Sequence, residues 1–92
     1  MFEWDESKAA QNLKKHKVLF EEAVDVFFDP EAVEGDARSD IEPRFFLIGL
    51  SGLRRVLVVV FTVRRSSYGT EKFRLISARP ASRKERSHYQ RR

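Results

Sequence analysis

The spacing of hydrophobic residues in the first third of the chain is helical. Apolar side chains recur every three or four residues over Glu6–His16 and again over Phe20–Phe27, which predicts two consecutive helices. Asp5 is a suitable N-cap residue for the first helix, and Asp29-Pro30 stops the second. Before them, the alternation of apolar and polar residues over Phe2–Trp4 indicates a short edge strand.

The second half of the chain has the period of β-strands. Arg44–Leu50, Arg54–Arg65 and Lys72–Arg79 are rich in β-branched and aromatic residues. The turn Ser51–Leu53 and the loop Ser66–Glu71 separate them, and such short connections predict an antiparallel meander. Regular alternation along the last strand would place its side chains in two sets: Phe73, Leu75, Ser77 and Arg79 on one face, and Arg74, Ile76 and Ala78 on the other.

The remaining segments complete a single domain over residues 1–92. Glu31–Pro43 is acidic and predicts a mobile connection, with a short strand at Ala32–Val33. Ser82–Glu85 has the spacing of a capping box, which predicts a terminal helix to about Tyr89. We therefore expect an α+β fold. Its small antiparallel sheet would contain the three-stranded meander and the short N-terminal strand, with two N-terminal helices and one C-terminal helix packed on one face.

Charge is distributed unevenly along the chain. Residues 1–42 contain 5 Lys or Arg and 12 Asp or Glu, whereas residues 43–92 contain 13 Lys or Arg and 2 Asp or Glu. The two parts therefore carry net charges of −7 and +11, which give the overall +4. A domain with this polarity has a cationic face suited to a polyanion. The alternative is that the two halves neutralise each other across a packed interface, although a basic excess would remain.

Several classes of protein are disfavoured. The chain has no cysteine, which excludes disulfides and thiolate metal sites. Its longest apolar run, Val56–Phe61, is too short to cross a bilayer, and its start lacks a signal region, so we expect a cytoplasmic protein. The histidines, His16 and His88, lack ligand spacing, and we expect no metal or other cofactor. Glycine-rich phosphate loops and nucleophile elbows are absent.

The function that remains after these exclusions is chemistry on RNA by cationic side chains. Cleavage without a metal uses the 2′-hydroxyl of the RNA as nucleophile. The protein must then accept its proton, stabilise charge on the phosphate and protonate the leaving 5′-oxygen. Arginine suits the second task because its planar guanidinium donates two hydrogen bonds to phosphate oxygens and keeps its charge. The chain supplies arginines at strand ends and on the terminal helix, but a basic DNA-binding module would look similar.

Each candidate also has a structural interpretation. His16 ends a helix, where the helix dipole favours a partly charged imidazole. Arg64 ends an apolar strand and could simply keep it soluble. Arg83 and Arg86 could form an ordinary solvated helix face, and Tyr89 could anchor that helix.

The expected distance between Arg64 and Arg79 decides which of them is the favoured catalytic centre. In a regular hairpin closed by Ser66–Glu71, Arg65 would oppose Lys72, and Arg79 would stand about 20 Å from Arg64. One phosphate cannot contact both arginines unless the strands bend or a bulge intervenes. Arg79 with the terminal helix is therefore the favoured centre.

The order of short motifs along the chain resembles the BrnT family of toxins. The matching segments in the first half are Phe2–Asp5, Asn12–His16, Val18, Phe20–Ala23 and Asp29-Pro30, and those in the second half are Val58–Thr62, Arg64, Arg74–Arg79, Ala81–Arg86 and Tyr89. The family usually has a glycine where this chain has Lys17, which predicts a different end for the first helix.

The resemblance implies a RelE-like fold and a ribonuclease toxin of a type II toxin–antitoxin system that inhibits translation and growth. It implies neutralisation by a BrnA-type antitoxin with a ribbon-helix-helix part, through which the complex would bind its own promoter DNA. Carried over by position, the expected catalytic residues are His16, Arg64 and Arg79, and the expected RNA contacts are Lys14, Lys15, Arg83, Arg86 and Tyr89.

Two other functions stay open from sequence. A non-catalytic nucleic-acid-binding or repressor module would bind RNA or DNA in a salt-sensitive way without cleaving it. A degenerate toxin would bind its antitoxin and spare cells.

Overall fold

The centre of the molecule is a five-stranded sheet with the strand order β1-β5-β4-β3-β2. The computed structural model describes residues 1–90. β1 runs parallel to β5, and all other neighbouring strands are antiparallel. The sheet is therefore mixed, and the expectation of a wholly antiparallel sheet is wrong. The strands are β1 (Phe2–Glu3), β2 (Val33–Ala37), β3 (Arg44–Leu50), β4 (Val56–Arg65) and β5 (Glu71–Pro80).

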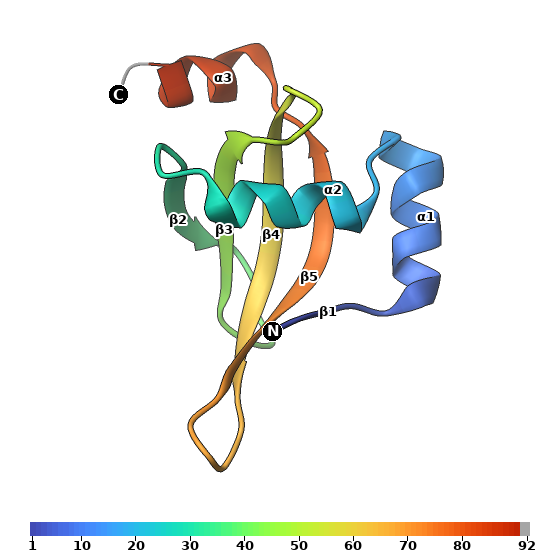
Figure 1. Cartoon of the computed structure of the whole chain (residues 1–92), viewed down its shortest axis with the longest axis vertical. Helices are drawn as coiled ribbons and strands as arrows, with labels where there is room; N and C mark the ends of the chain where they lie inside the picture. Colours follow the sequence, from blue (N-terminus) through green and yellow to red (C-terminus); the bar gives the residue numbers. More distant parts are fainter. Residues whose placement is uncertain (91–92) are drawn as a thin grey trace.

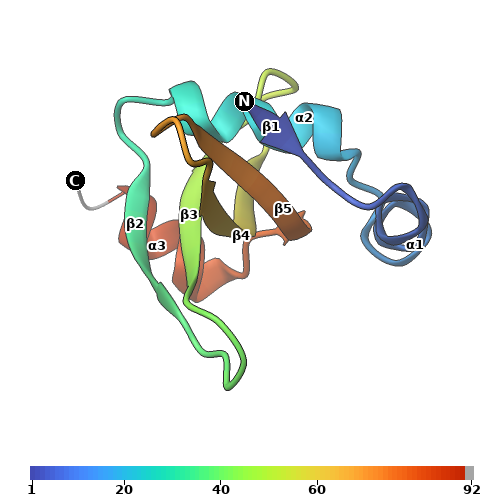
Figure 2. The same cartoon turned by 90° about the horizontal axis from the view of Figure 1, so that it is seen from below.

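The three helical segments predicted from the sequence are confirmed. They are α1 (Glu6–His16), α2 (Phe20–Val24), which tightens into the 3₁₀ helix η1 (Asp25–Phe28), and α3 (Arg83–Gln90). α2 and α3 lie on opposite sides of the sheet, and α1 lies beside the edge formed by β1 and β5 (Figures 1 and 2). The expectation that all helices pack on one face is therefore wrong. None of the helices within residues 1–90 is long and apolar enough to span a membrane.

The acidic segment after η1 contains a longer strand than the sequence predicted, since a strand was expected only at Ala32–Val33. β2 pairs with β3 from Val33 opposite Ile48 to Ala37 opposite Arg44, so the predicted mobile connection is wrong over this stretch and the sheet has five strands rather than four. Small and apolar residues alternate here with Glu34 and Asp36, but the acidic composition hides this period. A Cβ atom on Gly35 would lie 2.5 Å from the Phe46 ring, so only glycine fits there without a shift.

A bulge in β5 divides that strand into two parts. Val60 pairs with Ser77, but its neighbour Phe61 pairs with Leu75, so Ile76 is an extra residue without a partner in the register. Residues directly opposite each other on neighbouring strands share a face of the sheet. The bulge therefore moves Ser77 onto the face opposite Leu75. The prediction of regular alternation along this strand is wrong from Ile76 onward.

The sheet packs differently on its two sides. The side under α2 holds the main core, in which β4 and β5 meet the helices. The other side has a smaller cluster at one end, where Tyr89 of α3 packs near Ile48, Val58 and Ala81. The fully buried residues of the main core are Val18, Phe20, Ala23, Val26, Leu57, Val59, Leu75 and Ala78.

The ends of α1 and α3 follow the predicted capping chemistry. Asp5 accepts a hydrogen bond from the backbone N–H of Lys8 at 3.1 Å, and Ser82 and Glu85 form the reciprocal bonds of a capping box at 3.2 and 2.8 Å. Lys17 follows α1 with φ 61°, the left-handed conformation that glycine adopts most readily. Lys17 thus ends α1 in a conformation typical of glycine, and a difference from the family at this point stays a prediction.

Candidate functional site

The side of the sheet that carries α3 also carries most of the cationic side chains of the strands. Arg79 lies opposite Val58, Arg74 opposite Thr62 and Lys72 opposite Arg64, so all these side chains share one face. Without the bulge at Ile76, Arg79 would belong to the opposite face, among the buried core residues. We call this side the cationic face. The cations that its strands carry are Arg44, Arg64, Lys72, Arg74 and Arg79.

Arg79 borders a hollow of about 300 Å³ on the cationic face. The floor is apolar and comes from three neighbouring strands, while α3 provides one wall. A guanidinium beside an apolar floor retains more of its attraction for an anion than one surrounded by water. The residues lining this hollow are Ala37, Phe46, Ile48, Val58, Val60, Arg79, Glu85 and His88.

Glu85 holds Arg79 in place. The two Nη atoms of Arg79 donate to the two carboxylate oxygens of Glu85 at 2.8 and 2.9 Å, and Glu85 also accepts from the Ser82 backbone N–H. The hydrogen bond from Arg79 is the main cause that lowers the pKa of Glu85 to about 2, and the same bond raises the pKa of Arg79. A guanidinium has five N–H donors, so Arg79 keeps donors for a phosphate while it is paired with Glu85.

His88 is a functional candidate in the structure, although from the sequence it was weighed only as a metal ligand. It is exposed on α3 and lines the Arg79 hollow. The sequence did contain a signal, because Glu85 and His88 are three residues apart in a capped helix and such residues share a helix face. Once Arg79 was a candidate, that spacing could have placed His88 beside it.

His16 lines a second, more polar hollow of about 200 Å³ between α1 and β5. Ser77 belongs to this hollow and pairs across the sheet with Val60, which lines the Arg79 hollow. Ser77 also precedes Arg79 by two residues on one face, about 7 Å along the strand. The structure therefore brings His16 and Arg79 to the same stretch of β5. Other residues of this hollow are Lys8, Gln11, Asn12, Lys15 and Ile76.

Asn12 fixes the helix that presents His16. Its side chain is buried, donates to the backbone carbonyls of Val18 and Ala78 at 3.0 and 2.8 Å, and accepts from the Ala78 N–H at 3.1 Å. A polar side chain with three such bonds ties α1 to the strand next to Arg79. Asn12 belongs to the Asn12–His16 segment singled out from the sequence, but no role was predicted for it.

Arg64 does not join this centre. It lies opposite Lys72 near the hairpin end of the sheet, whereas Arg79 lies opposite Val58, six residues back along β4. Six residues of extended strand span about 20 Å, as predicted. The bulge changes the face of Arg79 but does not remove the separation. The predicted neighbours of the hairpin were wrong by one residue, since Arg65 lies opposite Glu71.

The predicted RNA contacts lie at two sides of the site. Lys14 and Lys15 are exposed in the last turn of α1, and Arg83 is exposed at the start of α3. Arg86 donates to the carbonyl of Ala81 at 3.0 Å. The Tyr89 hydroxyl donates to the carboxylate of Asp29 at 2.6 Å, which anchors α3. Contact of these five side chains with RNA stays a prediction.

A second strong ion pair serves the scaffold. Glu22 is buried and accepts from Arg55 Nε at 3.0 Å and from the Ser51 hydroxyl at 2.6 Å. The hydrogen bond from Arg55 is the main cause that lowers the pKa of Glu22. Arg55 also donates to the carbonyl of Lys17 at 3.0 Å, so this group joins the β3–β4 turn to both N-terminal helices.

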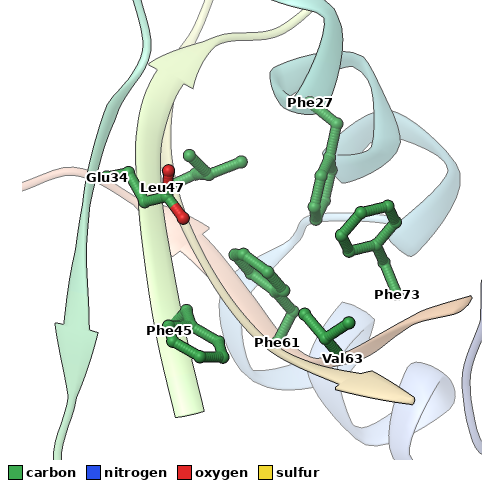
Figure 3. Close-up of a pocket in the computed structure, with 7 residues that line it drawn as sticks. All are labelled: Phe27, Glu34, Phe45, Leu47, Phe61, Val63 and Phe73. Atoms are coloured by element: carbon green, nitrogen blue, oxygen red, sulfur yellow. The ribbon is translucent and has the colours of Figure 1, made fainter. Parts of the chain in front are cut away.

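The other side of the sheet has an aromatic hollow of about 320 Å³ (Figure 3). The ring of Phe61 lies 4.9 Å from that of Phe27 and 5.9 Å from that of Phe73, both with near edge-to-face geometry. This hollow faces away from Arg79 and is not part of the candidate site. Its other lining residues are Glu34, Phe45, Leu47 and Val63.

Among the described residues, no group of three or more His, Cys, Asp or Glu side chains could hold a metal ion. The fold and the cationic face thus define a small α+β protein with a cationic surface on its sheet.

Comparison with known proteins identifies the family. The family model described as "Ribonuclease toxin, BrnT, of type II toxin-antitoxin system" matches residues 4–85, and the chain belongs to this family. The chain is also similar to the crystal structure of the Brucella abortus ribonuclease toxin BrnT, with a TM-score of 0.68 and 27% sequence identity. That match covers 90% of this chain and 99% of the Brucella chain. No curated protein sequence matches this chain. The predicted relation to RelE-type toxins stays a prediction.

Proposed function

We propose that the protein is a metal-independent endoribonuclease whose catalytic centre lies on the cationic face around Arg79. The observation that carries this proposal is the placement of Arg79 beside an apolar hollow that His88 also lines. His16 lines a second hollow, whose residue Ser77 is two residues from Arg79 on the same face. Membership of a ribonuclease toxin family supports the reaction class. The toxin would cleave RNA and inhibit translation and growth.

The proposed reaction needs a base, an acid and a cation. The RNA 2′-oxygen attacks the adjacent phosphorus as its proton passes to one histidine. The bond from phosphorus to the 5′-oxygen of the next nucleotide breaks, and that oxygen takes a proton from the other histidine. The products are a 2′,3′-cyclic phosphate end and a 5′-hydroxyl end. Arg79 stabilises the additional negative charge on the phosphate between these steps.

The family also implies an antitoxin partner. We propose that this partner is a BrnA-type protein with a ribbon-helix-helix part that binds promoter DNA, and that the pair acts in the cytoplasm. The surplus of cations on the cationic face suits an acidic segment of the antitoxin.

Cleavage of a structured RNA in excess chelator tests the proposal. We expect Arg79→Ala to lower kcat about 100–1000-fold, the range seen when one donor to a developing charge is removed. His16→Ala and His88→Ala should each lower kcat. Arg54→Ala is a charge-matched control, because Arg54 is exposed in the β3–β4 turn and lines neither hollow.

Two results would contradict the proposal. Salt-sensitive RNA binding without defined fragments would favour a non-catalytic nucleic-acid-binding module. Undiminished cleavage and growth arrest with Arg79→Ala, in a protein with an unchanged circular dichroism spectrum, would show that the centre lies elsewhere.

A further inference from the structure

The hairpin end of the cationic face carries a second group of cations far from Arg79. Arg64 lies opposite Lys72, and Arg74 is two residues from Lys72 on the same face. Phe45 of β3 pairs with Phe61 of β4, so the next position along these antiparallel strands places Arg44 opposite Thr62. On its other side, Thr62 pairs with Arg74. We call Arg44, Arg64, Lys72 and Arg74 the distal cluster.

Two polar atoms at the centre of this cluster are buried without a hydrogen-bond partner among the described residues. They are Arg44 Nε and the hydroxyl oxygen of Thr62, whose residue is 2% exposed. Buried polar groups are normally paired, because an unpaired donor or acceptor costs free energy. Both atoms are shielded from solvent, so they can pair with a phosphate oxygen only where the side chains that cover them move aside.

The charges around the cluster favour an anion. Glu3 is the carboxylate that faces it from β1, opposite Arg74 in the register. Its Oε2 atom lies 3.3 Å from Arg74 Nη1 and 3.8 Å from Arg64 Nε. Within residues 1–90, the ion pairs of this cluster are those with Glu3, so four cations share one paired carboxylate, and Glu3 orients two of the arginines.

The surface between the distal cluster and Arg79 suits unpaired bases. Phe46 and Val60 lie there opposite each other, half-buried, on the floor of the Arg79 hollow. α3 lies over one end of the sheet, and the β4–β5 hairpin projects from the other (Figure 1). Aromatic and apolar surfaces bind the faces of unstacked bases, while cations bind the backbone on either side.

We propose that the distal cluster binds a backbone phosphate of the same RNA strand that is cleaved at Arg79. Along β4, the distal cluster lies about 13 Å (at Thr62) to 20 Å (at Arg64) from Val58, the partner of Arg79, a span of several nucleotides. The preferred substrate class is therefore single-stranded RNA long enough to reach both. This proposal rests on the proposed ribonuclease function, because Arg79 is taken as the cleavage centre.

The test compares two substrates that share one mapped cleavage point. One is a single-stranded RNA dodecamer with this point near its middle, and the other is shortened to the trinucleotide around it. Lys72→Ala/Arg74→Gln should raise KM for the dodecamer about tenfold and leave kcat nearly unchanged, since phosphate contacts position the substrate. Kinetics on the trinucleotide should not change. Arg54→Gln serves as a control for the loss of one surface charge elsewhere.

A second variant and a binding measurement keep the test decisive. Arg44→Gln should act in the same direction, with thermal unfolding as the check on its fold. The dodecamer with a 2′-deoxy nucleotide at the cleavage point cannot be cleaved and can be titrated by fluorescence anisotropy. Removal of each cation should reduce the slope of log affinity against log salt by about 0.7.

The outcomes separate the two proposals. Equal effects of the distal variants on both substrates, or no effect on either, would overturn the distal site. If the wild-type protein cleaves neither RNA, the proposed function fails. In that case, a loss of dodecamer affinity confined to the distal variants would still support the cluster as an RNA-binding site, and unchanged affinity would overturn it.

Discussion

The two faces of the sheet are built from alternate residues of the same strands, yet they do different work. The face under α2 is apolar along β4, where Leu57 and Val59 are fully buried and Phe61 is 3% exposed. The cationic face changes along its length from Val58, beneath α3, to exposed Arg64 near the hairpin. One face stabilises the fold because a helix excludes water from it, and the other retains charge because most of it has no such cover.

The bulge at Ile76 allows one strand to serve both faces. Before it, Leu75 faces the main core, and after it Arg79 faces the candidate site, four residues further on. In a regular strand these two residues would share a face. Bulges near functional sites commonly redirect a side chain in this way. Stability and function therefore depend on different substitutions in β5, which the following predictions test.

The largest expected effect is on the buried face. Leu75→Ala should lower the free energy of unfolding by about 2–5 kcal/mol, because it leaves a cavity in the main core. Ser77→Ala, on the cationic face of the same strand, should change it by less than about 1 kcal/mol. Urea unfolding measures both values. Similar losses from the two substitutions would mean that the faces do not divide as described.

A smaller effect is expected from the pair that links Arg79 to α3. The pKa of Glu85 is lowered to about 2, so its charge stabilises the folded state above the ordinary value near 4.5, and this contribution disappears as the pH falls through 2. Glu85→Gln should cost about 1 kcal/mol near neutral pH, because Arg79 is 42% exposed and water weakens the pair. Urea unfolding of both proteins from pH 6 to 2 measures the difference.

That difference should shrink as the pH is lowered from about 4.5 towards 2, the range set by the ordinary and lowered values. A difference that stays constant with pH would show that the variant acts through packing instead of charge. Glu22, whose pKa is also lowered, titrates in both proteins and cancels in the comparison.

The smallest expected effect is a gain in stability away from both faces. Lys17 is held at φ 61°, so Lys17→Gly removes the cost of a left-handed side-chain-bearing residue. After the larger chain entropy of glycine is subtracted, the folded state should gain about 0.5–1 kcal/mol. Thermal unfolding and the cleavage assay together check it. A change in cleavage rate would show that the end of α1 influences His16 more than its geometry indicates.

Much of the fold followed from short-range pattern. The helical repeat over Glu6–His16, the capping box at Ser82–Glu85 and the β-branched run at Val56–Phe61 each appear in the structure where the pattern placed them. Capping, periodicity and β-propensity depend on residues within a few positions of each other. Such signals can be read directly from a sequence.

The candidate site followed from sequence only in part. The 20 Å separation of Arg64 and Arg79 could be predicted, because strand geometry fixes the rise per residue. His88 entered the site through α3 packing, and Asn12 was tied to Ala78 across 66 positions of sequence. Contacts at such separations depend on how the elements dock.

By itself, the sequence determined the helices, the central strands, the segregation of charge and the family resemblance. The tertiary structure decided that β2 completes the sheet, that α3 lies opposite α2, and that Arg79 joins the cationic face. The physical reason is that a bulge or an edge pairing is selected by the total burial and hydrogen bonding of the docked elements. A local sequence pattern does not specify which of these arrangements forms. At Ile76, the presence of the bulge determines the face of the sheet on which Arg79 lies.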